Sequence, residues 1–590
     1  MHSSKTNKIE NIRHSLAHLL AAVVQKRYPK VKLGIGPAIE GGFYYDFLFA
    51  KPISADVLPE IEKDMRELIR KGLVFSGEKI TPAKARTLFK NQTFKLELIK
   101  DFSKEKKQLT TYKTGDVFQD LCKGGHVKNT SEINPDAFKL THLAGAYWKG
   151  DEKNKMLTRI YGAAFETKRE LDEYLAHIAE AEKRDHRRIG KELDLFTFSD
   201  LIGAGLPLFT PRGAAMREAL IDFLWSLSKK YGYQKVSIPH ITKIDLYEKS
   251  GHAAKFKDEF FYVHGAQSGA DFVMKPMNCP HHTQIYASRP RSYRDLPIRL
   301  NEPTMMYRDE KPGQLRGIER VRSITVDDAH IFCTPDQIKD EAKNIVKIIK
   351  EFYSALGMWK EGVTFWVSLS VRDPKNLKKY LGEDKNWNKA ENFLEEVALG
   401  MDLNAKRMEG EAAFYGPKLD FMFKDALGRE TQLATIQIDF VQPDRLGLEY
   451  VSENGKKEIP VMIHRAIAGS LERFMSILIE HFAGVFPLWL SPVQIVVIPI
   501  SEKFNKYAEE VREKLFNADI RVEVDDSNET LGKRIRSAEM QKAPYIAIVG
   551  EKEMNAGTIA LRKRGKGDEG VIGVDKFIER LEKEIEEKTL

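Results

Sequence analysis

The sequence contains few cysteines and no long apolar run. Only three cysteines, Cys122, Cys279 and Cys333, occur among 590 residues, and an odd number spread over so long a chain argues against a disulfide framework. A reducing compartment fits this content better. No run reaches the roughly 18 apolar residues that a membrane helix requires, and the first residues, MHSSKTNK, lack the apolar core of a signal peptide. These absences predict a soluble, cytoplasmic protein with no membrane partner.

A large excess of one charge is also absent. Lys and Arg number 94 against 86 Asp and Glu, for a formal net charge of +8. A surface dense in both signs with a modest basic excess permits nucleic-acid binding without demonstrating it. The sequence shows no internal repeat and no low-complexity tract. At 590 residues the chain is too long for one hydrophobic core, and the usual domain size predicts about four units.

The N-terminal part has the pattern of a compact α+β domain. Apolar residues recur at helical spacing from Ile12 to Val24, and a glycine-rich stretch with the string GFYYDF (42–47) follows. The charged segment 166–191 carries a single apolar stripe, which is typical of an exposed helix. We therefore predict a domain over residues 1–165 and a linker helix over 166–191.

The rest of the chain divides into a long central region and a short C-terminal one. Residues 192–490 mix strand-like runs, such as Val236–Ile241 and Thr435–Val441, with helical ones such as Asp336–Ser354. Residues 491–590 alternate strand and helix patterns, which predicts a small α/β domain with a partly parallel sheet.

Three segments of the central region gather groups that can bind phosphate or metal: MYRDE (306–310), DDAHIFC (327–333) and HRAIAGSLERF (464–474). Each is weak alone, because a single arginine is most often a surface residue. Together with YGYQKVSIPHI (231–241) they resemble the motifs of class II aminoacyl-tRNA synthetases. The strings that resemble the threonyl branch of that class are PMNCP (276–280), SYRDLPIR (292–299), DDAHIFC, FYGPKLDF (414–421) and VMIHRAI (461–467).

The resemblance implies a catalytic domain, built on an antiparallel sheet, that uses ATP with Mg²⁺. Attack of a carboxylate on the α-phosphate builds negative charge, which fixed guanidinium groups and Mg²⁺ stabilise. By resemblance, Arg308 holds the α-phosphate, Arg473 holds the γ-phosphate and Glu310 reads the adenine amino group. Arg320 and Arg322 would flank the loop that meets the tRNA acceptor end.

Cys279, His330 and His464 are the more unusual set. Thiolate and imidazole suit zinc, and three protein ligands leave one coordination position open for a substrate. Their separations of 51 and 134 residues match no short zinc spacing, and a lone buried cysteine is otherwise a small apolar residue, so the set depends on the resemblance. The family's zinc, one per subunit, binds the amino group and hydroxyl of threonine, and Asp328 occupies the position that also accepts from the hydroxyl.

Other catalytic residues follow from the resemblance alone. Tyr415 and Lys418 match positions of the aminoacyl-adenylate pocket, and Gln432 and Gln437 lie on the strand beneath it. His252 matches a histidine proposed to assist proton transfer when threonine moves to the tRNA ribose. The alternative for His252 is an exposed loop histidine without a catalytic role.

Threonine selection by its hydroxyl implies a second activity. A site built around a hydroxyl rejects valine by roughly 10⁴ to 10⁵, whereas one methyl group separates two substrates by only about 1–3 kcal/mol. Serine has the hydroxyl and lacks only the methyl group. The mechanism therefore predicts that mischarged serine is removed.

Two pairs of residues in the N-terminal domain could supply this activity. His14 and His18, in HSLAH, lie one helical turn apart on one face, and such a pair alone is most often a surface feature. Cys122 and His126 follow in DLCKGGH. The two pairs resemble the editing domain shared by threonyl- and alanyl-tRNA synthetases. Clustered imidazoles with a carboxylate such as Asp120 can position a water and accept its proton.

Lys95, in TFKLEL, matches a further position of that editing domain. The same histidines and cysteine could instead bind zinc, as in the alanyl relative. The threonyl branch is usually interpreted as metal-free here, and we follow that interpretation.

The C-terminal domain resembles an anticodon-binding domain. Glu553 and Arg562 match positions that contact anticodon bases, and polar side chains read the exposed edges of RNA bases in loops. The alternative for these residues is a solvated charge run on a strand edge.

Some features differ from the family pattern. Val326, His281, Leu433 and Ala434 replace the usual residues near the expected adenylate pocket. The small ubiquitin-like domain of many bacterial relatives has no counterpart before HSLAH.

The sequence thus predicts a multidomain α+β homodimer of the threonyl branch, with ATP, L-threonine and tRNA(Thr) as partners. Two alternatives remain: a non-catalytic paralogue that binds tRNA-like RNA, and a synthetase for proline or serine, because a fold does not decide the substrate.

Overall fold

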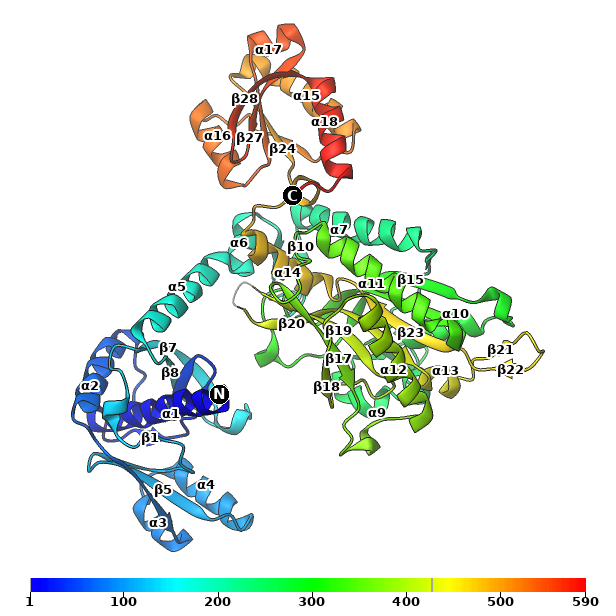
Figure 1. Ribbon diagram of the computed structural model, residues 1–590. Helices are drawn as coiled ribbons and strands as arrows, with labels where there is room; N and C mark the ends of the chain where they lie inside the picture. Colours follow the sequence, from blue (N-terminus) through cyan, green and yellow to red (C-terminus); the bar gives the residue numbers. More distant parts are fainter. Residues whose placement is uncertain (1, 426–427) are drawn as a thin grey trace. The chain divides into compact units, whose positions relative to one another are not determined.

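The computed structural model describes residues 2–425 and 428–590. They form two compact units, Met1–Glu180 and Ala181–Leu590, which Figure 1 colours along the sequence. No helix in these described ranges is both long enough and apolar enough to cross a membrane.

The segment 166–191 is not the single helix that its sequence predicts. It forms α5 (Lys168–Arg184) and α6 (His186–Glu192), and the division between the two units falls within α5. The helices separate at Asp185, because its side chain accepts the N–H of Arg187 and caps α6.

The first unit packs a long helix, α1 (His2–Arg27), against an antiparallel sheet. The predicted helix over 12–24 is confirmed: Leu16, Leu19 and Leu20 are fully buried and pack with β3 (Gly42–Leu48). The sheet has the order β1-β3-β8-β7, with β2 beside β3. The remaining elements of this layer are β1 (Lys32–Leu33), β2 (Ala38–Ile39), α2 (Leu58–Arg70), β7 (Phe138–Tyr147) and β8 (Met156–Ala164).

A second, three-stranded antiparallel sheet completes the first unit. It consists of β4 (Phe75–Ile80), β5 (Leu109–Thr114) and β6 (Phe118–Leu121), accompanied by α3 (Pro82–Leu88) and α4 (Thr93–Lys104). Strand β6 contacts α1. The residues that follow β6 are therefore brought to the histidine-bearing helix.

The second unit is built on an eight-stranded sheet with the order β11-β15-β16-β23-β20-β19-β17-β18. All pairs are antiparallel except the two at the edges, so the predicted antiparallel catalytic sheet is confirmed. The strands are β11 (Gln234–Lys235), β15 (Ile298–Tyr307), β16 (Ser323–Cys333), β17 (Phe365–Val371), β18 (Lys406–Glu409), β19 (Lys418–Lys424), β20 (Glu430–Asp439) and β23 (Val461–Ala466).

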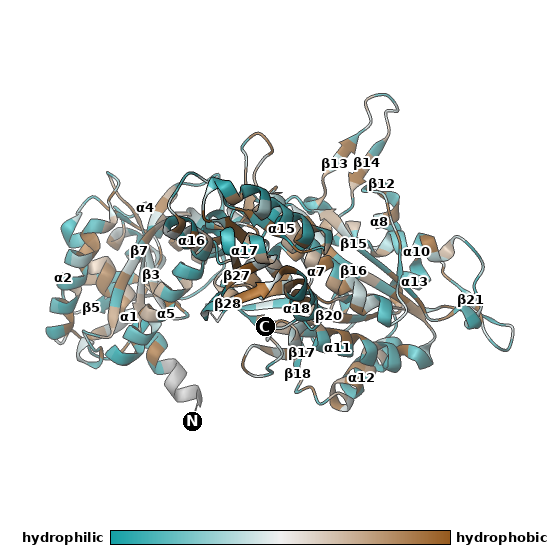
Figure 2. Cartoon of the chain, turned by 90° about the horizontal axis from the view of Figure 1, so that it is seen from above, coloured by the Kyte–Doolittle hydropathy of each residue, from teal (hydrophilic) through white to brown (hydrophobic). Residues whose placement is uncertain are grey.

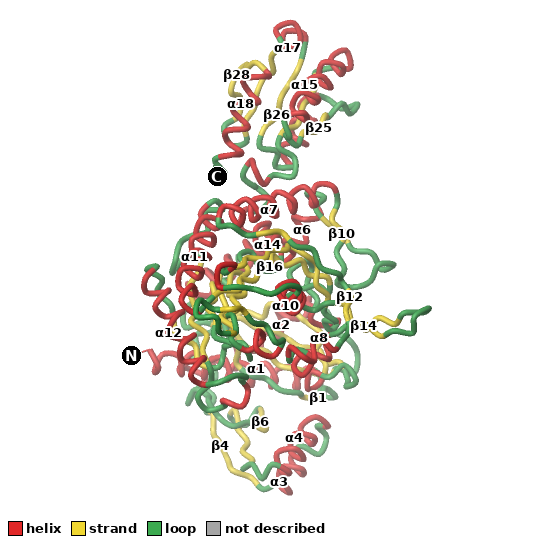
Figure 3. The backbone as a smooth tube through the Cα atoms, turned by 90° about the vertical axis from the view of Figure 1, so that its right-hand side faces the viewer, coloured by secondary structure: helices red, strands yellow, loops and turns green. Residues whose placement is uncertain are grey.

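Helices surround this sheet, and small hairpins project from it. The helices are α7 (Pro211–Lys230), α8 (Asp245–Ser250), α9 (Ala253–Phe256), α10 (Cys279–Ala287), α11 (Ile338–Ser354), α12 (Asp384–Gly400), α13 (Val441–Arg445) and α14 (Leu471–Phe482). Short strands are β9 (Phe196–Thr197), β10 (Leu208–Phe209), β12 (Ile241–Thr242), β13 (Tyr262–His264), β14 (Asp271–Met274), β21 (Tyr450–Val451) and β22 (Lys457–Glu458). The hairpin of β13 and β14 projects from the unit in both Figure 2 and Figure 3.

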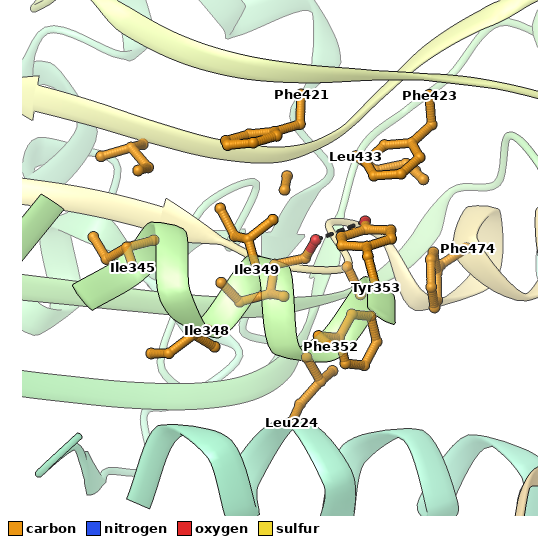
Figure 4. Close-up of a cluster of buried hydrophobic side chains, with 14 of the residues drawn as sticks. Leu224, Ile345, Ile348, Ile349, Phe352, Tyr353, Phe421, Phe423, Leu433 and Phe474 are labelled. Atoms are coloured by element: carbon orange, nitrogen blue, oxygen red, sulfur yellow. Dashed lines mark hydrogen bonds between the residues drawn. The ribbon is translucent and has the colours of Figure 1, made fainter. Parts of the chain in front are cut away.

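One face of the central sheet forms the main hydrophobic core. Alternate residues of β19, including Phe421 and Phe423, pack against α11, where Tyr353 stacks on Phe423 (Figure 4). The Tyr353 hydroxyl donates to the carbonyl of Ile467 at 2.9 Å. Because residues alternate between faces, the polar neighbours of these aromatic residues are directed to the opposite face of the sheet.

The strand predicted over Val236–Ile241 is wrong for most of its length. Regular pairing stops after Lys235. The N–H of Ile238 donates to the side chain of Glu302 at 3.0 Å rather than to a strand carbonyl, and Pro239 has no N–H to donate.

The C-terminal region forms the predicted partly parallel sheet, with the order β25-β24-β26-β27-β28 and the first three strands parallel. The elements are β24 (Ile495–Pro499), α15 (Asn505–Asn517), β25 (Val522–Val524), α16 (Leu531–Met540), β26 (Tyr545–Val549), α17 (Glu551–Ala556), β27 (Thr558–Lys563), β28 (Gly567–Gly573) and α18 (Val574–Glu586). The sequence pattern missed α17 and β28. Strand β28 is an exposed edge rich in glycine and charge, so it lacks the usual strand composition.

A buried ion pair connects two central strands and gives a stability prediction. Asp327 and Arg465 are each 1% exposed, and Arg465 Nη1 lies 3.2 Å from Asp327 Oδ2. The same carboxylate accepts the N–H groups of Ile467 and Gly469 at 2.9 and 3.1 Å. Burial raises the pKa of Asp327 to about 6, so the carboxyl is still ionised at pH 7.5.

Asp327→Asn should lower the free energy of unfolding by about 3–5 kcal/mol, because it leaves the Arg465 guanidinium buried without a counter-charge. Urea unfolding at pH 7.5 measures the change. Lys506→Ala is the control, since its ion pair with Glu510 is exposed and its loss should cost at most about 0.5 kcal/mol. A cost for Asp327→Asn as small as that of the control would contradict the prediction.

Candidate active site and metal site

The register of four central strands places predicted site residues in one row. His330 on β16 lies opposite His464 on β23, His464 lies opposite Gln437 on β20, and Gln437 lies opposite Lys418 on β19. Directly opposed residues on antiparallel strands share a face, with side chains in contact distance. Tyr415 extends the group, since its hydroxyl donates to Gln437 Oε1 at 2.6 Å.

Cys279 completes a compact set of metal donors beside this row. It is the first residue of α10, and its Sγ and one ring nitrogen each of His330 and His464 lie within 4.8 Å of one another. All three residues are buried. A thiol and two imidazoles that border one cavity suit zinc with an open coordination position.

The ring of His464 is held by a residue that sequence reasoning missed. His464 Nε2 lies 2.9 Å from Asp439 Oδ2, and Asp439 Oδ1 in turn accepts the N–H groups of Val441 and Gln442 at 2.7 and 2.9 Å. A carboxylate behind a ligating histidine orients the ring and raises its basicity. No spacing in the sequence joins these residues, because their contact depends on the pairing of β20 with β23.

A cavity of about 770 Å³ lies over the row and the metal donors. The other predicted residues that line it are Arg308, Arg473, His252, Asp328, Tyr415 and Gln432. The structure therefore gathers residues from seven separate stretches of the chain, between 252 and 473, around one space.

The two phosphate-binding candidates come from different elements. Arg308 follows β15, and its Nε donates to the carbonyl of Pro276 at 3.3 Å. Arg473 lies in the first turn of α14, and its Nε donates to the carbonyl of Glu319 at 3.1 Å. Two anchored guanidinium groups in one cavity suit a polyphosphate.

Three predicted residues, Glu310, Arg320 and Arg322, are not among the described residues that line the cavity. Arg320 Nη2 lies 2.7 Å from Glu310 Oε2, and Arg322 Nε donates to the Glu310 carbonyl at 3.0 Å. Glu310, Arg320 and Arg322 thus form an adjoining cluster, in which the carboxylate expected to read adenine is paired with an arginine.

Asp420 holds two of the predicted residues in place, although no sequence pattern indicated this role. Its Oδ2 lies 2.9 Å from Lys418 Nζ, and its Oδ1 accepts from Gln432 Nε2 at 2.8 Å and from the Thr435 hydroxyl at 2.6 Å. The carboxylate is 3% exposed. It fixes the ammonium and the amide on the cavity floor.

His252 is buried rather than exposed, so the surface alternative is wrong. Its side chain is 2% exposed, its Nδ1 lies 2.9 Å from Ser250 Oγ and its Nε2 lies 3.7 Å from Cys279 Sγ. Burial lowers the pKa of His252 to about 3. The ring is therefore neutral at pH 7, with one unprotonated nitrogen.

The four residues that differ from the family pattern fall in two places. Val326 and Leu433 line the cavity. Ala434 and His281 are buried, and neither is among the described residues that line it.

The first unit holds a second cavity, of about 1020 Å³, with its own donor cluster. His14 and His18 on α1 meet Cys122 and His126, which follow β6, with donor atoms all within 4.8 Å of one another. Cys122 Sγ lies 3.5 Å from His14 Nε2 and 3.2 Å from His126 Nε2. The helical pair and the loop pair are thus one site.

A buried ion pair supports this second site. Lys95 is 1% exposed, and its Nζ lies 2.6 Å from Asp120 Oδ1. The hydroxyl of Tyr45 donates to Asp120 Oδ2 at 2.5 Å. Sequence reasoning missed Tyr45, although its place in GFYYDF alternates with the outward Tyr44 along β3.

Burial keeps the imidazoles and the thiol of the second site uncharged. Desolvation lowers the pKa of His14, His18 and His126, and it raises the pKa of the Cys122 thiol to about 11. At neutral pH the cluster therefore presents neutral imidazoles and a thiol, which can accept and donate protons without a net charge.

The two predicted anticodon residues lie on neighbouring elements of the C-terminal sheet region. Glu553 is in α17, where its Oε2 accepts the N–H of Gly550 at 3.0 Å. Arg562 is on β27, and its Nη2 lies 3.7 Å from Glu539 Oε1.

Comparison with known families places the three regions of the chain. Residues 261–482 match the family described as tRNA synthetase class II core domain (G, H, P, S and T). Residues 494–584 match the anticodon binding domain, and residues 109–161 match the threonyl and alanyl tRNA synthetase second additional domain. The fold is that of a class II aminoacyl-tRNA synthetase.

Full-length relatives narrow this class. The threonine–tRNA ligase of Gloeobacter violaceus is 48% identical over 599 residues, which cover 100% of this chain and 94% of that protein. The threonine–tRNA ligase of Porphyromonas gingivalis is 50% identical over 580 residues, 97% of this chain and 87% of that protein. The chain belongs to the threonine–tRNA ligase family.

Two solved structures whose titles name threonyl-tRNA synthetases also resemble this chain. The structure titled RNA binding domain of threonyl-tRNA synthetase from Cryptosporidium parvum Iowa II is 36% identical with a TM-score of 0.63, and the match covers 68% of this chain and 98% of that one. A putative threonyl-tRNA synthetase from Aeropyrum pernix is 28% identical with a TM-score of 0.60, covering 69% of this chain and 97% of that one.

The buried histidines of the first unit predict a pH-dependent stability. Their folded pKa values lie below the ordinary 6.5, so the unfolded chain binds more protons as pH falls through 6.5. The stability of the first unit should be fully present above that pH and fall below it, by up to about 1.4 kcal/mol per pH unit for each histidine.

Urea unfolding of the full chain at pH 7.5, 6.5 and 5.5 measures this dependence. His18→Gln removes one titrating group and should reduce the slope. A first-unit transition with the same midpoint at all three pH values would contradict the prediction.

Proposed function

We propose that the chain activates L-threonine with MgATP to threonyl-adenylate and transfers it to tRNA(Thr), with zinc bound in the catalytic cavity. The observation that carries this proposal is the donor set Cys279, His330 and His464 on the wall of the same cavity that holds Arg308 and Arg473. The groups proposed to select the amino acid and those proposed to bind phosphate therefore line the same cavity.

The donor set explains how threonine would be chosen. Cys279, His330 and His464 would hold a zinc ion, which would act as a Lewis acid that binds the amino group and hydroxyl of the amino acid. Asp328 lines the cavity beside His330, and Asn278 Nδ2 donates to its Oδ2 at 3.1 Å. Its carboxylate is thus oriented to accept from the hydroxyl. Valine offers no hydroxyl and leaves this acceptor unpaired, which a buried site penalises.

The arginines would serve the activation step. A carboxylate oxygen of threonine attacks the α-phosphorus of ATP, the bond to the bridging oxygen breaks, and pyrophosphate leaves with its magnesium. Negative charge grows on the phosphate oxygens, where Arg308 and Arg473 would stabilise it. Their anchoring through Nε keeps the guanidinium groups in place before the reaction.

The transfer step needs a proton acceptor near the adenylate. The ribose hydroxyl of the tRNA attacks the carbonyl carbon of the adenylate, and its proton must leave. His252 lines the cavity with a neutral ring. It could take that proton directly or through the ribose.

We propose that the second cavity hydrolyses Ser-tRNA(Thr). His14, His18, Cys122 and His126, with the carboxylate of Asp120, would position the attacking water and accept its proton, and Lys95 would hold Asp120 in place. The neutral imidazoles support this role because a general base must be unprotonated at working pH. The proposed hydrolysis needs no metal ion at this site.

The remaining assignments follow the family resemblance. We propose that Glu553 and Arg562 contact anticodon bases, that Glu310, Arg320 and Arg322 meet adenine and the acceptor end, and that the chain acts as a cytoplasmic homodimer through the segment 231–241. A non-catalytic paralogue would be expected to lose phosphate-binding or metal-binding residues. The five candidates for these roles are all present: Arg308, Arg473, Cys279, His330 and His464.

Amino-acid-dependent exchange of pyrophosphate into ATP, run across the twenty amino acids, tests the catalytic proposal. Threonine should give the strongest response, serine a weaker one, and valine one lower by roughly 10⁴. Cys279→Ala should abolish the threonine response because the open metal position is lost. A response to proline alone, or normal exchange by a zinc-free Cys279→Ala variant, would refute the assignment.

The double variant His18→Ala, Cys122→Ala tests the editing proposal. Threonine charging should be unchanged, since both residues lie in the first unit. Deacylation of Ser-tRNA(Thr) should fall by roughly 10² to 10⁴, and Ser-tRNA should accumulate during charging with serine. Equal deacylation rates for the variant and the parent chain would remove the claim.

A further inference from the structure

The metal donor His330 is backed by a second histidine. His330 Nδ1 lies 2.8 Å from Nδ1 of His282, and the two rings meet edge to face with centroids 4.7 Å apart. His282 follows Cys279 by three residues in α10. The two histidines are 1% and 0% exposed, so no solvent competes for this contact.

The other nitrogen of His282 faces a buried carboxylate. His282 Nε2 lies 3.7 Å from Glu302 Oε2, and Glu302 is 8% exposed. Within the described part of the chain, neither atom has a hydrogen-bond partner. The nearby ammonium of Lys275 donates to the Thr304 hydroxyl at 3.0 Å instead. His282 Nε2 and Glu302 Oε2 therefore face each other, and neither atom makes a hydrogen bond elsewhere among the described residues.

Glu302 is itself fixed from two directions. It lies on β15 directly opposite Asp328 of β16, and its Oε1 accepts the N–H of Ile238 at 3.0 Å. That second contact is the one that replaces the expected strand pairing before Pro239. The carboxylate cannot rotate away from His282 without leaving a buried N–H unsatisfied.

These contacts order the tautomers in series. A metal bound at His330 Nε2 would leave the proton of that ring on Nδ1, so His282 Nδ1 accepts and the proton of His282 lies on Nε2, 3.7 Å from the Glu302 carboxylate, which only accepts. His330 Nε2 lies 3.6 Å from Asp328 Oδ1 at the cavity.

We propose that His282 and Glu302 are positioning residues for the metal site: the carboxylate fixes the tautomer of His282, and His282 fixes the ring and tautomer of His330 so that Nε2 faces the metal. This inference depends on the zinc assignment made under the proposed function. It gives His330 the support that Asp439 gives His464, with a histidine placed between ligand and carboxylate.

Zinc affinity of the full-length chain, measured by competition with a chromogenic chelator, tests the proposal. His282→Leu, which has no acceptor for His330, and Glu302→Gln should each weaken zinc binding by about 10- to 100-fold, as removal of outer partners of ligating histidines does. In Glu302→Gln the amide oxygen must stay on the Ile238 N–H, so an N–H turns toward His282 Nε2 and favours the wrong tautomer.

His281→Leu is the matched control. His281 is the neighbouring residue of the same helix and is also buried, but neither of its nitrogens has a hydrogen-bond partner among the described residues. The same substitution there should leave zinc affinity unchanged. Thermal unfolding of the zinc-stripped proteins separates a loss of metal affinity from a loss of fold, and the stripped Glu302→Gln chain should unfold within a few degrees of the stripped parent.

The outcomes are distinct. Parent-like zinc affinity in either His282→Leu or Glu302→Gln would overturn the proposal, as would an equal loss in His281→Leu. Recovery of zinc affinity in His282→Asn, whose Oδ1 takes about the place of His282 Nδ1 and can accept from His330, would support it. A parent chain that binds no zinc at all would instead overturn the zinc assignment, and this inference with it.

Discussion

The register of the central antiparallel sheet is the constraint on which the catalytic site depends. His330, His464, Gln437 and Lys418 share a row because β16, β23, β20 and β19 pair in one specific alignment. Side chains alternate between faces with a period of two, so a slip of one residue in any of these pairs would turn its site residues into the core.

The opposite face of the sheet makes such a slip costly. Phe421 and Phe423 pack under α11 with Tyr353, and a slip would expose these rings while burying the polar row. Asp327 and Arg465 add a second lock, because their ion pair joins β16 to β23 within the core. The hydrophobic face thus fixes the geometry of the polar face, although it contains no catalytic group.

The two cavities use similar donors in different ways. Carboxylates stand behind the histidines of the catalytic cavity: Asp439 contacts His464 directly, and Glu302 faces His282, which contacts His330. In the first unit the carboxylate of Asp120 is instead occupied by Lys95 and Tyr45. The histidines of the first unit therefore face one another and Cys122, and no carboxylate among the described residues makes a hydrogen bond to their rings. This arrangement suits proton transfer to and from water.

The sequence by itself determined the class of the protein, because short strings such as MYRDE and PMNCP resemble those of its family, and that resemblance named the arginines, cysteine and histidines that the structure brings to one cavity. It also predicted the helix over 12–24 from its apolar residues, and the α/β C-terminal domain from its alternation of strand and helix patterns. Only the tertiary structure decided which residues stand behind the donors. Asp439, Asp420, Tyr45 and Glu302 reach their partners through strand pairing and buried side-chain contacts between segments distant in the chain, and such contacts leave no periodic trace in a single sequence. The break at Asp185 and the loss of pairing before Pro239 have the same origin, since a side chain took the place of a backbone partner.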